Sequence, residues 1–189
     1  MLSKVLTKLI DKAIVPAILL LSSRIISILL VSKYLGINFR ISKSGFIFGS
    51  ALDYTTVNSY SAVLMTAMLV IGLFYVMAKS LFFHESHIKP TLTSRLFSLR
   101  AQSLIQSSFD IYTQGAVWLS YSYLLLIVAG IMTLSNLMFT WTFYIILGVT
   151  VLTTIFFIFD IEEEVKIKKE DKEEYDMDKS FIELPGELE

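Results

Sequence analysis

The chain has 189 residues, of which 54% are hydrophobic and 17% charged, and its formal net charge at pH 7 is −1. A soluble globular domain carries about 25% charged residues, so this composition argues against a soluble protein and favours a polytopic membrane protein. The absence of cysteine excludes disulfides, thiol redox chemistry and cysteine metal sites.

The first segment, residues 1–12, predicts a short amphipathic helix. Leu2, Leu6 and Leu9 repeat at helical spacing, and lysines occupy the other face. We expect this helix to lie on the anionic cytoplasmic surface of the membrane, as a plain anchor or as a surface sensor. Pro16 follows, at a place that suits the first turn of the next helix.

Four segments are long and apolar enough to cross the bilayer, because about 20 apolar residues cover its hydrocarbon core as a helix. They are residues 13–35, 61–83, 116–135 and 140–159. The sequence therefore predicts an all-α fold, a bundle of four transmembrane helices that forms a domain over residues 13–159. The first segment is too long for a cleaved signal peptide and has no small-residue cleavage site after it, so we expect it to remain as an anchor.

Arg24 lies in the middle of the first apolar segment, about 16 Å along a helix that starts at Ala13. An arginine at this depth costs from about 2.5 kcal/mol upwards if it faces lipid. Ser23 and Ser27 share its side of the helix and allow a second helix to approach closely. The sequence therefore predicts an intramembrane polar contact at Arg24, Ser23 and Ser27.

Four explanations for Arg24 stay open. Hydroxyls of its own bundle, such as those of Thr66 or Thr150, would satisfy it within the chain. The side chain would otherwise snorkel toward the surface, or meet an acid on another protein. A place on an anion or substrate pathway is the fourth explanation.

The loop between the first two segments contains Gly45 and Gly49 at GxxxG spacing, but outside any 20-residue apolar run. The helix-dimer argument therefore does not apply to them. Glycines and aromatic residues predict an ordered turn at the outer surface, where Asp53 is the only acid.

The sequence HESH contains the only two histidines, His84 and His87, which would share one face of a helix. They are weak candidates for a metal site, because zinc takes three or four protein ligands and the protease pattern HExxH needs a spacing of four. We expect neither a metal nor a cofactor.

The second loop predicts a cytoplasmic amphipathic helix over about residues 93–113. One face of it would either dock a partner or pack on the bundle itself. The docking residues expected on that face are Phe97, Leu104, Ile105 and Tyr112.

Aromatic residues in the last two spans predict belts at the headgroup level, where tryptophan and tyrosine are enriched. The third loop is short and forces these two helices into an antiparallel hairpin. The residues assigned to the belts are Trp118, Tyr121, Tyr123, Trp141 and Tyr144.

Residues 160–189 form an acidic tail, with thirteen acids and five lysines. Glu162/Lys166 and Glu164/Lys168 stand in the favourable i, i+4 order, so we expect the fourth helix to continue for two or three turns. Beyond about Lys172 the composition predicts disorder.

Lysine and arginine in the loops predict the orientation. Twelve of them lie on the side of the two termini and three on the other side. We therefore expect a multi-pass protein with both termini in the cytoplasm. Small size, no cysteine and no glycosylation sequon favour a prokaryotic cytoplasmic (inner) membrane.

No nucleophile, paired carboxylate or phosphate loop stands out, which argues against an enzyme. The sequence favours a non-enzymatic membrane subunit or scaffold of a larger assembly. Its partners would be the lipid bilayer and other membrane subunits or copies of this chain, and not nucleic acid. The alternative is a small oligomeric transporter or channel. In that case Gly72, Gly130 and Gly148 would loosen the helices, and Thr150, Thr153 and Thr154 would line a path.

Overall fold

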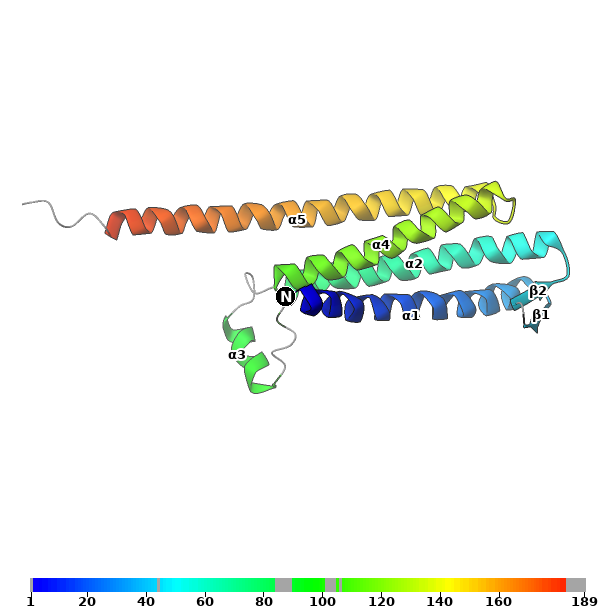
Figure 1. The fold of residues 1–189 in the computed structure, drawn as a ribbon, viewed down its shortest axis with the longest axis horizontal. Helices are drawn as coiled ribbons and strands as arrows, with labels where there is room; N and C mark the ends of the chain where they lie inside the picture. The colour runs from blue at the N-terminus through cyan, green and yellow to red at the C-terminus, as the bar shows by residue number, and fades with distance from the viewer. Residues whose placement is uncertain (1, 44, 84–89, 101–104, 106, 183–189) are drawn as a thin grey trace, which may run out of the picture. The chain divides into compact units, whose positions relative to one another are not determined.

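The computed structural model describes residues 2–43, 45–83, 90–100, 105 and 107–182. In this part the chain is mostly helical and contains one small two-stranded sheet. It divides into two compact units, residues 1–154 and 155–189. The helices and strands are α1 (Leu2–Leu35), β1 (Phe39–Ser42), β2 (Gly45–Phe48), α2 (Ala51–Phe83), α3 (Pro90–Ser98), α4 (Ser108–Leu134) and α5 (Thr140–Ile182) (Figure 1).

Four of the helices are long and apolar enough to cross a membrane, as the sequence predicted. Their apolar stretches are Ile10–Leu35 in α1, Ala51–Lys79 in α2, Phe109–Leu134 in α4 and Thr140–Glu162 in α5. Large apolar side chains on their outer faces are exposed, as lipid-facing residues are.

The predicted break between an interfacial helix and the first span is not present. α1 runs without interruption from Leu2 to Leu35, and Pro16 lies inside it rather than in its first turn. The prediction for Pro16 is therefore wrong. Proline removes one backbone N–H, and apolar helices tolerate this when neighbouring groups supply other partners.

Two helices begin earlier than predicted. α2 begins at Ala51, ten residues before the predicted start at residue 61, and the Ser50 hydroxyl accepts the Asp53 backbone N–H at 3.0 Å. α4 begins at Ser108 instead of residue 116, and its N-cap Ser107 accepts the Asp110 N–H at 3.4 Å. In both places a serine three residues before an aspartate caps the helix.

The single helix predicted over about residues 93–113 is wrong in its bounds. α3 ends at Ser98, and Arg100 has a φ of 54°, a left-handed conformation that ends a helix. Ser107 then starts α4, so residues 108–113 belong to the next long helix. The cap at Ser107 and the left-handed Arg100 divide this segment, although its apolar residues are spaced as in one amphipathic helix.

The ordered turn predicted in the first loop is a β-hairpin. β1 and β2 pair antiparallel, with Phe39 opposite Phe48 and Ile41 opposite Phe46. Gly45 has a φ of 117°, which glycine adopts readily. Phe46 and Phe48 pack on a small core of Ile28, Val31 and Val57, so the hairpin covers the ends of α1 and α2.

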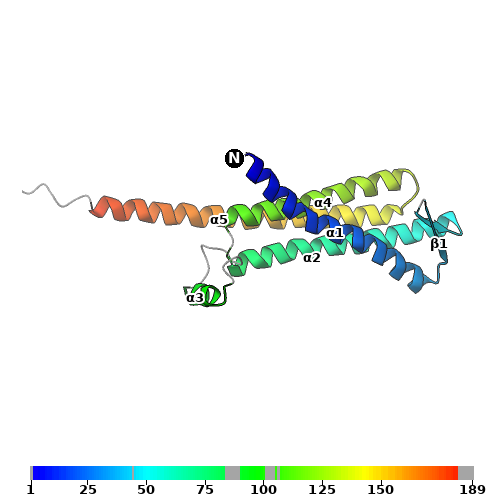
Figure 2. The same ribbon diagram turned by 60° about the horizontal axis from the view of Figure 1, so that its bottom comes forward.

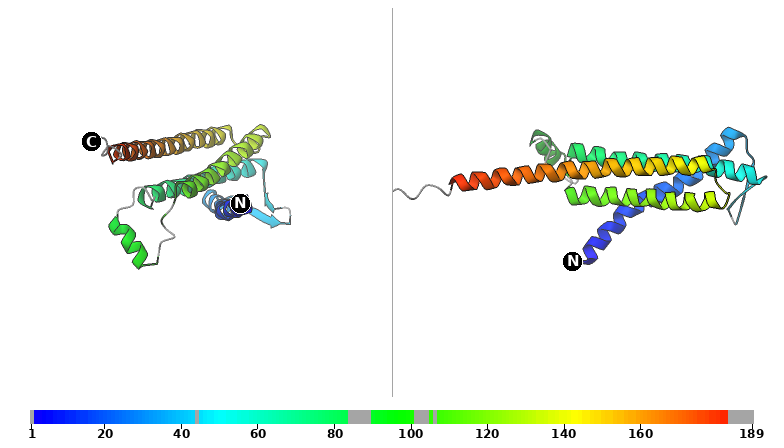
Figure 3. Two further views of the ribbon diagram at one scale, coloured as in Figure 1. Left: turned by 60° about the vertical axis from the view of Figure 1, so that its left-hand side comes forward. Right: turned by 90° about the horizontal axis from the view of Figure 1, so that it is seen from above.

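Within residues 1–154, α1 packs against both α2 and α4 (Figures 2 and 3). A second core joins Ala62 of α2, Ala129 of α4 and Ile146 of α5. Trp118 of α4 is 5% exposed and lies against Gly72 of α2, where a Cβ atom would overlap the indole ring. The missing glycine side chain admits the indole between the two helices, so Trp118 is buried in protein; its depth at the headgroup level stays a prediction.

α5 continues as a helix to Ile182, ten residues beyond the predicted onset of disorder at Lys172. That prediction is wrong as far as Ile182. No proline or glycine occurs between Asp160 and Ile182, and acid–base pairs at i, i+4 support a helix that has no apolar face of its own.

Candidate functional site

Arg24 lies on α1, eleven residues before Leu35, or about 16 Å from that end of the span at 1.5 Å per residue. Its side chain is half-buried. The same face of α1 carries Ser27, Ile28 and Val31, which are buried against the neighbouring helix. This spacing of three, four and seven residues turns the guanidinium toward α2.

The guanidinium of Arg24 is hydrogen-bonded within the chain. One of its terminal nitrogens, Nη1, donates to the hydroxyl of Ser61, and the other, Nη2, donates to the side-chain oxygen of Asn58. Asn58 and Ser61 stand three residues apart on α2, so they present their acceptors on one face. Both are almost fully buried.

Asn58 extends this contact to the turn between α4 and α5. Its side-chain nitrogen donates to the backbone oxygen of Leu137 at 2.8 Å and lies 3.3 Å from the sulfur of Met132. Asn136, at the tip of that turn, has a φ of 57°, which asparagine tolerates better than most residues. One amide group therefore joins α1, α2 and the α4–α5 turn.

Ser59 makes a second connection to the same turn. Its hydroxyl accepts the backbone N–H of Phe139 at 2.9 Å and donates to the backbone oxygen of Thr55 at 2.7 Å. Ser59 has no exposed surface, so its hydroxyl would otherwise be a buried polar group without a partner. We name Arg24, Asn58, Ser59 and Ser61 the polar cluster.

The polar cluster stabilises a cation by dipoles, since the groups that bind Arg24 are a neutral amide and a neutral hydroxyl. Such contacts hold helices in a fixed register, because an unpaired polar group costs free energy in an apolar medium. The arrangement is suited to joining helices. It does not resemble a nucleophile held by a base.

A separate polar contact lies where α1 and α4 begin their apolar stretches. The Nζ of Lys12 lies 2.7 Å from Oδ1 of Asp110 and also donates to the backbone oxygen of Asp110 at 3.0 Å. Lys79 of α2 interacts electrostatically with both residues. The hydroxyl of Tyr121, assigned to the belt, donates to the backbone oxygen of Ala13 at 3.2 Å. These contacts join α4 to the start of α1.

The structure brings only part of the predicted site together. Ser27 is buried beside Arg24, whereas Ser23 is half-buried and donates to the backbone oxygen of Leu20. Thr66 and Thr150, named as possible partners of Arg24, do not bind it. Thr66 donates to Ala62 of its own helix, and the buried Thr150 hydroxyl has no partner among the described residues.

The predicted docking residues do not form one face. Phe97 is exposed on α3, Ile105 is half-buried between α3 and α4, and Tyr112 belongs to α4. Leu104 lies outside the described residues, as do His84 and His87. Within the described ranges no group of three or more histidine, cysteine, aspartate or glutamate residues is placed to hold a metal ion.

Sequence reasoning missed Asn58 and Ser59 because it assigned residues 51–60 to a loop, and it placed Ser61 at the first position of the second span without linking it to Arg24. The signal was present as Ser50 followed by Asp53, a serine and an acid at the spacing of a helix N-terminus. With α2 begun at Ala51, Asn58 and Ser61 fall within a span and face Arg24. A comparison with known protein families, curated proteins and solved structures gives no match for this chain.

Proposed function

We propose that the chain is a non-enzymatic integral membrane subunit or scaffold of a larger membrane assembly. In this proposal residues 1–154 hold the protein in the bilayer, and the charged end of α5 binds a partner. Both termini face the cytoplasm, because the side of the termini carries twelve of the fifteen lysines and arginines that lie in the termini and loops. The membrane is a prokaryotic cytoplasmic membrane.

The observation that carries the proposal is the continuity of α5. The helix passes from an apolar stretch, Thr140–Glu162, into about 20 further helical residues, a length of roughly 30 Å. Residues 160–189 hold thirteen acids and five lysines. A charged helix with no apolar face to pack on is suited to binding a basic surface.

The polar cluster supports the same proposal in a different way. A membrane subunit needs helices in a fixed arrangement, and Arg24, Asn58 and Ser59 supply hydrogen bonds between them. Arg24 therefore has partners inside the chain and needs no acid from another protein. The proposed partner-binding surface therefore lies on α5 and not at Arg24.

The transporter alternative has less support. Gly72 packs on Trp118, and the hydroxyls of Thr153 and Thr154 bind backbone oxygens of their own helix. Thr154 is also 3.0 Å from the hydroxyl of Tyr123. The Gly72–Trp118 and Tyr123–Thr154 contacts lie between helices, and the Thr153 hydroxyl is used within its own helix, so these groups do not support an open path.

The test is purification of the full chain from native membranes in a mild detergent, with an affinity tag on the N-terminus so that α5 stays free. Charge is removed from α5 by E173Q, E174Q and D176N together. A stoichiometric partner that binds the wild type and is lost from this variant supports the proposal.

The matched control neutralises lysines of the same helix, K168Q and K172Q, which should leave binding to a basic partner intact or strengthen it. Recovery of the same set of proteins with both variants, or of the chain alone with each, would overturn the proposal. Uptake assays in liposomes would then address the transporter alternative.

A further inference from the structure

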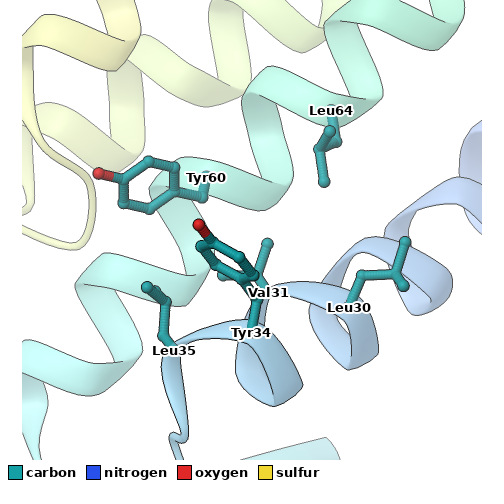
Figure 4. A pocket seen from close by; sticks show the side chains of 6 residues that line it. All are labelled: Leu30, Val31, Tyr34, Leu35, Tyr60 and Leu64. Carbon is teal, nitrogen blue, oxygen red and sulfur yellow. The ribbon is translucent and has the colours of Figure 1, made fainter.

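An apolar groove lies between the ends of α1 and α2 that meet at the β-hairpin (Figure 4). Its volume is about 380 Å³, within the range of about 300–1,000 Å³ that small-molecule sites occupy. The lining residues are Leu30, Val31, Tyr34, Leu35, Tyr60 and Leu64. We name this the tyrosine groove.

The tyrosine groove has an aliphatic part and a phenolic part. Tyr34 and Tyr60 lie next to each other near the hairpin end, and Leu30 and Leu64 lie deeper along the two helices (Figure 4). Tyr34 is 90% exposed, and the hydroxyls of both tyrosines lack a hydrogen-bond partner among the described residues. The groove therefore offers hydroxyl groups at one end and hydrocarbon at the other.

Cations predominate at this end of α1 and α2. Residues 33–60 contain Lys33, Arg40 and Lys43, and Asp53 is the only acid among them. Lys33 stands in the last turn of α1, directly before Tyr34, and is exposed. An anionic group at the mouth of the groove would find this charge complementary.

We propose that the tyrosine groove binds one anionic phospholipid, with an acyl chain on Leu30 and Leu64 and the phosphate near the Tyr34 hydroxyl and Lys33. All six lining residues belong to apolar stretches long enough to span a membrane, so the groove would be exposed to lipid. Hydroxyl groups at the end of an apolar groove, with an exposed cation in the same helical turn, match an anionic headgroup above a chain.

Trp141 provides a built-in reporter of occupancy. Its ring lies edge-on to that of Tyr60, with centroids 5.4 Å apart, and it is partly exposed. Trp118, the other tryptophan, is buried between α2 and α4 and supplies a constant background. The variant W141F measures that background.

The experiment reconstitutes the full chain in phosphatidylcholine vesicles that contain a minor fraction of phosphatidylglycerol. Bromine, which quenches tryptophan emission, is carried on the acyl chains of one lipid or the other at the same mole fraction. We expect stronger quenching of Trp141 by brominated phosphatidylglycerol. K33Q should weaken this preference about fivefold, the effect of one cation near an anionic headgroup.

L64F fills the groove and should lower quenching of Trp141 by both lipids. L29F is the matched control, because Leu29 is exposed on α1 but does not line the groove. Equal quenching by the two lipids, unchanged in K33Q, would overturn the proposal. So would a stable dimer in which neither lipid quenches Trp141, since a second copy would then cover the groove.

Discussion

At the scale of single residues, Arg24 shows how a charge is accommodated in the middle of a helix that is long and apolar enough to span a membrane. The two terminal nitrogens of its planar guanidinium reach two acceptors three residues apart on α2, Asn58 and Ser61. Lysine has one terminal nitrogen and cannot reproduce this fork. Neutral acceptors are enough to bind the guanidinium, because each of these polar groups would otherwise lie unpaired in an apolar environment, which costs free energy.

Removing either side of this contact should destabilise the protein. R24L leaves the Asn58 side-chain oxygen without its donor, and N58L leaves Nη2 of Arg24 and the Leu137 backbone oxygen without a side-chain partner. We expect each change to lower the free energy of unfolding by about 1–3 kcal/mol. The measurement is unfolding in mixed detergent micelles, followed by tryptophan fluorescence.

The double variant R24L/N58L separates this contact from unrelated damage. If the two residues interact, its loss should be smaller than the sum of the single losses, by about 0.5–3 kcal/mol. Strictly additive losses would contradict the contact. R24K should fall between the wild type and R24L, because it keeps the charge and at most one of the two bonds.

Alanine substitutions at Gly72 and Gly148 test the close approach of α2 and α4. A Cβ atom at Gly72 would overlap the Trp118 indole, whereas one at Gly148 meets nothing within 4 Å. G72A should therefore destabilise the protein by about 1–3 kcal/mol, because a ring held between two helices must move. G148A should be neutral or slightly stabilising. Equal melting temperatures in detergent for the two variants would argue against the close approach of α2 and α4.

At the scale of helices, polar contacts join α2 both to α1 and to the α4–α5 turn. α1 reaches it through Arg24, and the α4–α5 turn reaches it through Asn58 and Ser59. Apolar helices in lipid have no hydrophobic force that favours one register, so hydrogen bonds and small residues select it. The α4–α5 turn is therefore held by side chains of a helix distant in sequence.

The contact of Ser59 with this turn can be tested by hydrogen exchange. S59A removes the acceptor of the Phe139 amide while keeping a residue that favours helix. We expect a local loss of about 1 kcal/mol, which speeds exchange of that amide roughly fivefold.

T153A is the control for that experiment, because the Thr153 hydroxyl binds only backbone oxygens of its own helix. Exchange at Phe139 should be unchanged in this variant. The same rate of exchange at Phe139 in S59A and in the wild type would mean that the turn does not depend on Ser59.

At the scale of the whole molecule, charge is segregated along the chain. Residues 160–189 carry a net charge of −8, and the first 159 residues carry +7. In the proposed topology, four spans place the two termini on one side of the membrane and the hairpin on the other. The absence of native cysteine allows single cysteines to report the side of each loop without background.

The prediction at this scale concerns the variants S42C, S98C and S180C. With intact cells or sealed vesicles of known orientation, a membrane-impermeant thiol reagent should label S42C from outside. It should label S98C and S180C only after the membrane is opened. Labelling of S42C and S98C from the same side would contradict four spans.

The sequence alone determined that four apolar helices are present. Hydropathy needs no tertiary information, since each span satisfies its backbone within itself. The same local reasoning located Arg24 near the middle of the first apolar stretch and the acidic segment after the fourth. It failed at helix starts, where the capping serines at Ser50 and Ser107 were not recognised, and at Lys172, where acid–base spacing sustains a helix.

Only the tertiary structure decided what Arg24 binds, where Trp118 lies and which residues line the tyrosine groove. Each of these depends on the register between two helices, and in an apolar medium that register is selected by a few polar and small side chains. The earlier start of α2 places Asn58 on the same helix as Ser61, and both then bind Arg24. Local patterns carry no information on such pairings between distant segments, because many registers bury the same apolar surface.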